Sequence, residues 1–81
     1  MRTRERADVA TVASALRAWF RRGAWLGLVA DVTKTTGVPV RRAVGVLRRF
    51  PDEVEALTGF PVTVDDAGGR WPVRLVVVVR R

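Results

Sequence analysis

The chain contains no cysteine and no histidine. Without cysteine it has no disulfide and no thiolate metal site, and without histidine it lacks the commonest metal ligand and acid–base catalyst. A serine nucleophile also needs a base, and Ser14 has no histidine to activate it. We therefore expect no enzymatic activity, no metal site, no cofactor and no small-molecule ligand.

The acidic residues and the glycine pair do not change this expectation. Asp65 and Asp66 stand in a turn-like segment, and Asp52 and Glu53 follow a proline at a predicted helix start, so local structure explains all four. The glycines at 68–69 lack the lysine and the following helix of a phosphate-binding loop.

Long apolar segments are also missing. The longest runs, AWLGLVA at 24–30 and LVVVV at 75–79, are far shorter than the roughly 20 residues that a spanning helix needs. The basic start carries Glu5 and Asp8, and no cleavable apolar region follows it. We therefore expect no membrane contact and a cytoplasmic location.

What the chain does contain indicates one small folded domain over residues 1–81. Hydrophobic residues make up 48% of the 81 residues and charged residues 28%, whereas a disordered chain would be poorer in apolar groups. A core of this size barely outweighs chain entropy, and with no disulfide available, dimerisation is the remaining means of stabilising it.

Positive charge dominates the first half of the chain. The sequence has 15 basic and 8 acidic residues, a net charge of +7, and Lys34 is the only basic residue that is not arginine. Residues 1–50 carry a net charge of +8 and residues 51–81 a net charge of −1. Arginine suits an anionic polymer because its planar fork grips phosphate or guanine with two bonds, although a GC-rich genome would favour arginine too.

Apolar periodicity predicts helices in the first half. The helical stripe Val9, Val12, Ala13, Leu16 and Phe20 predicts a helix over 7–22 that ends at Gly23. A second helix is expected from about residue 26 to Thr36, with Gly37 as its terminating glycine, and the segment GAWLG at 23–27 has the composition of a brief strand.

The segment 40–50 predicts a helix with two unlike sides. Its apolar residues fall on one side at about 100° per residue: Val40, Ala43, Val46, Leu47 and Phe50. The opposite side holds Arg41, Arg42, Arg48 and Arg49, with Gly45 among them and Val44 at their flank. A solvated helix face usually mixes charges of both signs, whereas no acidic residue on this helix neutralises its arginines.

The second half predicts a short helix and a hairpin. Pro51 ends the basic helix and begins an acidic one that runs to Gly59. Strands are expected over 60–64 and 71–79, joined by the turn DDAGGR at 65–70.

The order of these elements, together with the segment LVADVTKTTGVPVRRAVGVL, resembles the winged helix-turn-helix of small bacterial or phage DNA-binding regulators. The resemblance implies an α+β fold with a three-helix core, a short extra helix and a C-terminal β-hairpin wing. It also implies that residues 39–50 are a recognition helix in the major groove of double-stranded DNA, in a nucleoid-associated transcriptional regulator or repressor. The residues expected to bind DNA are Lys34, Arg41, Arg42, Val44, Gly45, Arg48, Arg49 and, at the wing tip, Arg70.

Alternatives remain at several positions. The arginines also suit a solubilising surface, or a winged-helix module that docks an acidic partner protein without sequence-specific DNA binding. Arg2, Arg4 and Arg6 suit a frayed terminus as well as a phosphate-tracking arm. The C-terminal strand is apolar on both sides, which predicts a homodimer through it, or a monomer in which the first helix covers that face.

Overall fold

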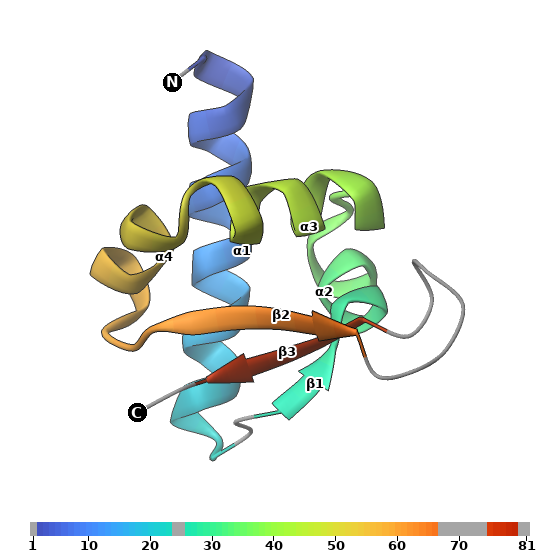
Figure 1. Cartoon of the computed structure of the whole chain (residues 1–81), viewed down its shortest axis with the longest axis vertical. Coiled ribbons are helices and arrows are strands. Elements are labelled where there is room, and N and C mark those ends of the chain that lie inside the picture. Colours follow the sequence, from blue (N-terminus) through green and yellow to red (C-terminus); the bar gives the residue numbers. More distant parts are fainter. Residues whose placement is uncertain (1, 24–25, 67–74, 80–81) are drawn as a thin grey trace.

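The structure of the chain is a computed structural model, which describes residues 2–23, 26–66 and 75–79. These residues form, in chain order, α1 (Thr3–Arg21), β1 (Leu26–Leu28), α2 (Val29–Thr36), α3 (Val40–Arg49), α4 (Pro51–Thr58), β2 (Val62–Asp66) and β3 (Leu75–Val79). The strands make one antiparallel sheet in the order β1–β3–β2, which lies below α3 and α4 in the view of Figure 1. The α+β class predicted from the sequence is confirmed.

The helices bury their apolar sides in a shared core. Every residue of the stripe predicted for α1 is buried, and Leu16 is fully so. From α3, Ala43 and Leu47 enter the same core, and the rings of Phe20 and Phe60 meet edge to face at 5.8 Å. The helical periodicity therefore identified the side of α1 that faces the protein interior.

Two helices end at glycines with left-handed backbone conformation. Gly37 follows α2 with φ of 78°, and Gly59 follows α4 with φ of 87°. Glycine adopts this conformation without the steric penalty of a side chain, and each glycine N–H donates to a carbonyl of the preceding helix. These two predicted helix ends are confirmed, and Gly23, the predicted end of the first helix, likewise has a positive φ of 80° directly after the C-cap residue Arg22.

Several boundaries differ from the sequence prediction, among them the start of β2 at Val62 rather than residue 60. α1 begins at Thr3 rather than at residue 7, so the basic N-terminal segment is helical. α2 begins at Val29 because residues 26–28 pair with β3, Leu26 opposite Val78 and Leu28 opposite Val76. β2 extends to Asp66 because Asp65 and Asp66, expected in the turn, pair with β3.

A short, well-bonded turn joins α2 to α3. The Thr36 hydroxyl donates to the Val32 carbonyl at 2.7 Å and accepts from the Val38 N–H at 3.1 Å. The Val38 side chain is buried, and Pro39 precedes the first turn of α3. These contacts fix the direction in which α3 leaves α2, and thus the orientation of its arginines.

β3 lies in the middle of the sheet, with β1 on one edge and β2 on the other. Both edges of β3 are therefore occupied, and edge-to-edge pairing of two C-terminal strands is not available to a homodimer. Two neighbouring leucines of β1 are exposed, Leu26 by 65% and Leu28 by 41%. The remainder of the predicted wing, including Arg70 and residues 71–74, lies outside the described residues.

Candidate nucleic-acid interface

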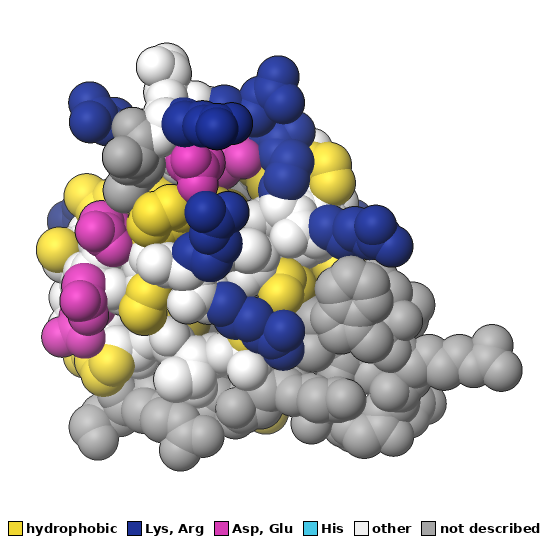
Figure 2. All heavy atoms as spheres, turned by 45° about the horizontal axis from the view of Figure 1, so that its top comes forward, with side chains coloured by type: hydrophobic (Ala, Val, Ile, Leu, Met, Phe, Trp, Pro, Cys, Tyr) yellow, Lys and Arg dark blue, Asp and Glu magenta, His cyan; other side chains and the backbone are white. Residues whose placement is uncertain are grey.

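The basic side of α3 faces solvent. Its four arginines are exposed on the side opposite the buried Ala43 and Leu47, as the periodicity predicts. Figure 2 shows basic side chains spread along this face of the molecule, with acidic side chains close to those at its upper end. The arginines form two rows with a spacing of seven residues, Arg41 with Arg48 and Arg42 with Arg49.

Val44 is not part of this surface, and its assignment as a DNA-binding residue was wrong. Its side chain is only 4% exposed and belongs to the hydrophobic core. α3 packs against α1, α2, α4 and β2, so its buried arc is wider than the stripe read from the sequence. Val44 lies at the edge of that wider arc, beyond the reach of a nucleic acid.

Gly45 lies among the arginines, and the fold does not require a glycine there. It has no positive φ, and a Cβ added to it would meet no atom within 4 Å apart from its chain neighbours and the nearby backbone of α3 itself. Close packing against another helix is therefore not the reason for this glycine. The absence of a side chain leaves the backbone of α3 accessible from outside.

Arg42 forms an ion pair with a residue of another helix. Its Nε donates to Asp8 Oδ2 at 3.0 Å and its Nη2 donates to Asp8 Oδ1 at 2.7 Å, a two-bond pair between α3 and α1. Asp8 is only 8% exposed, and Arg42 keeps 46% of its side chain exposed. Such bidentate, charge-assisted pairs are the strong ones, so Arg42 holds α1 to α3 rather than projecting freely toward a ligand.

The Asp8 carboxylate is stabilised in its charged form. The hydrogen bonds from Arg42 lower its pKa below the ordinary value, burial opposes this shift, and the charges of Arg42 and Arg4 add to the lowering. α3 carries no acidic residue of its own, but Asp8 of α1 partly neutralises its positive face. The residue spacing within α3 did not predict this contact.

Arg49 makes a looser contact with α1. Its Nη2 lies 3.6 Å from Glu5 Oε2, and 71% of the Arg49 side chain is exposed. The guanidinium also lies 5.6 Å from the centre of the Phe50 ring. An exposed ion pair at this distance contributes little to stability, so Arg49 can exchange partners at small cost.

Asp8→Asn is expected to lower the midpoint of thermal unfolding by a few degrees at pH 7. The carboxylate has a lowered pKa in the folded state, so its contribution to stability is present above about pH 4 and is lost as the pH falls through the folded pKa. The difference between wild type and variant should therefore shrink below pH 4, as measured by circular dichroism. A difference that stays constant from pH 7 to pH 2 would contradict this role.

The other predicted site residues lie apart from α3 or outside the description. Lys34 is exposed in the last turn of α2. Arg70 lies outside the described residues. Lys34 therefore adds positive charge beside the turn that leads into α3, while the wing contact stays a prediction.

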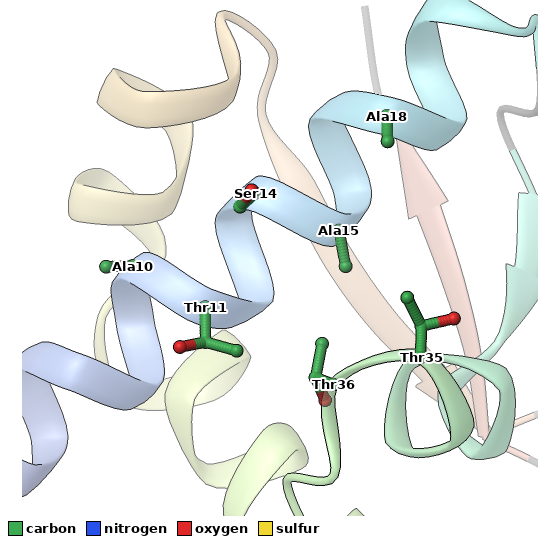
Figure 3. Close-up of a pocket in the computed structure, with 7 residues that line it drawn as sticks. All are labelled: Ala10, Thr11, Ser14, Ala15, Ala18, Thr35 and Thr36. Carbon is green, nitrogen blue, oxygen red and sulfur yellow. The ribbon is translucent and has the colours of Figure 1, made fainter.

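An open groove of about 560 Å³ lies between the outer side of α1 and the end of α2 (Figure 3). Its walls are small side chains without a charged group: Ala10, Thr11, Ser14, Ala15, Ala18, Thr35 and Thr36. In the part of the chain that the structure describes, no three acidic, histidine or cysteine side chains gather as metal ligands would. Within the same residues, no helix is both long and apolar enough to cross a membrane.

Comparison of the chain with known proteins finds no matching family model, no matching curated protein and no matching solved structure.

Proposed function

We propose that the chain binds double-stranded DNA through α3, as a small transcriptional regulator of the winged helix-turn-helix type. The observation that carries this proposal is the exposed row that Arg41 and Arg48 form on α3, next to the backbone at Gly45 that no side chain covers. α3 itself carries no acidic residue. A ten-residue helix fits the major groove, and arginine forms two bonds with a guanine edge.

The arrangement around α3 supports the same proposal. α2 and α3 are joined by a three-residue turn that fixes their relative orientation, and the antiparallel sheet combines β1, which precedes α2, with β2 and β3, which follow α4. A helix-turn-helix exposes its second helix to the groove in this way. The recognition surface therefore consists of Arg41, Gly45 and Arg48, with Lys34 nearby and Arg42 in a structural role.

The sequence preference should favour guanine. The chain has no asparagine or glutamine, the residues that read adenine with two bonds, whereas Arg41 and Arg48 suit the O6 and N7 acceptors of guanine.

A titration of fluorescently labelled random duplex at two ionic strengths tests the proposal directly. Affinity should fall steeply between about 50 and 200 mM salt, because each phosphate contact releases counterions. Fluorescence anisotropy measures the affinity. The slope of the logarithm of the affinity against the logarithm of the salt concentration gives the number of phosphate contacts. Absence of binding at the lower salt concentration would refute DNA binding and leave the protein-interaction module as the alternative.

A homodimer through the sheet stays a prediction. Since both edges of β3 are paired, the outer face of the sheet is the part that a second copy would cover, where Leu26 and Leu28 are exposed. Two α3 helices would then lie about a two-fold axis and read inverted half-sites. Sedimentation should show a concentration-dependent dimer that Leu26→Lys with Leu28→Lys abolishes, and a wild-type monomer at all concentrations would refute it.

A further inference from the structure

Arginines from two distant parts of the chain meet at the junction of α1 and α3. Arg2 and Arg4 lie at the start of α1, and Arg49 lies in the last turn of α3. Together with Glu5 they line an open hollow of about 570 Å³. Three arginines and one glutamate thus line the same hollow, so its lining has an excess of positive charge and of hydrogen-bond donors.

Glu5 has two contacts in this hollow. Its Oε1 accepts the backbone N–H of Arg2 at 3.3 Å, which caps the start of α1, and its Oε2 lies 3.6 Å from Arg49 Nη2. The first contact needs only an acceptor oxygen, whereas the second depends on negative charge. Glutamine at this position would keep the cap and remove the attraction for Arg49.

The ion pairs Asp8–Arg42 and Glu5–Arg49, which join α1 to α3, differ in strength. Asp8 and Arg42 share two short bonds and Asp8 is buried, whereas Glu5 and Arg49 share one long contact and Arg49 is 71% exposed. A phosphate has more acceptor oxygens than the single carboxylate oxygen that Arg49 now meets. The inner pair therefore keeps α1 against α3, while the outer pair can open without loss of the fold.

We propose that this hollow is a second binding site for the DNA phosphate backbone, in which phosphate oxygens replace Glu5 as the partner of Arg49 while Arg2 and Arg4 supply further donors. The inference rests on the proposed function, since it assumes that α3 already lies in the major groove. A helix in that groove runs between two sugar–phosphate strands, and α1, packed against α3, carries its arginines toward one of them. Glu5 then competes with DNA for Arg49.

Two pairs of variants test the site, each with a matched control. Arg2→Gln with Arg4→Gln should flatten the logarithmic salt slope of duplex binding by about two units, whereas Arg17→Gln with Arg21→Gln, at the far end of α1, should leave it nearly unchanged. Glu5→Gln should tighten binding about two- to tenfold at low salt, whereas Glu55→Gln, which changes net charge equally on α4, should have little effect.

The outcomes separate this site from the proposed function. If wild type binds duplex DNA but each variant behaves like its control, the second site is refuted while the proposed DNA binding stands. If wild type does not bind duplex DNA, both fail together. Thermal unfolding of each variant shows whether it is folded, and because the arginine pair and Glu5 are tested separately, one misfolded variant still leaves the other test decisive.

Discussion

Replacing Arg41 and Arg48 together by alanine is expected to weaken duplex binding roughly a hundredfold, with little change in thermal stability. An arginine that reads a base or holds a phosphate contributes roughly 1–3 kcal/mol, and about 1.4 kcal/mol corresponds to tenfold in affinity. Both residues are exposed on α3, opposite its buried side, so their removal leaves no cavity in the core. Anisotropy at two salt concentrations measures both the loss and the change in slope.

The control for this variant is a second double substitution of equal charge. Arg17→Ala with Arg21→Ala removes two exposed arginines from the C-terminal half of α1, away from the N-terminal half that supplies Glu5 and Asp8 to α3. If binding depends on α3, this control should lose much less affinity. An equal loss in both variants would show that net charge alone attracts DNA, and the assignment of α3 as the recognition helix would then be wrong.

Arg42 should affect the stability of the protein. Because its guanidinium is held by Asp8, Arg42→Ala removes one partner of a two-bond pair and leaves a buried carboxylate unpaired. Arg42, which the sequence predicts as a DNA-binding residue, is therefore expected to contribute to stability as well, and thermal unfolding of Arg42→Ala should show a lower midpoint than wild type.

Gly27→Ala is expected to destabilise the protein by roughly 1–3 kcal/mol, the usual cost of overpacking a core. A Cβ at this position of β1 would lie 2.5 Å from Cζ3 of Trp19, which is closer than atoms can approach. The Trp19 residue is only 8% exposed, so a shift of its ring away from the added methyl group would disturb the core contacts that the ring makes. For a domain of this size each kcal/mol lowers the unfolding midpoint by roughly 4–8 °C.

Gly45→Ala provides the matched control, because the same methyl group is added where it meets nothing within 4 Å. Alanine is favoured over glycine inside a helix, so this variant should be more stable than wild type by about 0.5–1 kcal/mol. Thermal or urea unfolding measures both variants. If Gly27→Ala were as stable as Gly45→Ala, the close contact between β1 and Trp19 would not exist in solution.

Local sequence determined the helices of this protein and most of their ends. The stripe on α1 from Val9 to Phe20 is spaced so that one side of any helix through it must be apolar. Gly37 and Gly59 end α2 and α4 because they adopt a left-handed conformation that other residues avoid. Likewise, alternating apolar residues and turn residues predicted the hairpin, although β2 proved to end two residues later than expected.

Tertiary structure alone decided which residues of α3 are available to a ligand. Periodicity shows that Arg42 and Val44 border the apolar side of α3, but it cannot show how far the neighbouring elements reach around that helix. The packing of α1, α2, α4 and β2 buries Val44, and Asp8, 34 positions away in the chain, holds Arg42. Local spacing encodes the direction of a side chain from its own helix, whereas its partners depend on long-range packing. Long-range packing also places Arg2 and Arg4 beside Arg49. From the sequence, a frayed terminus and a phosphate-binding arm were equally good interpretations of these two arginines.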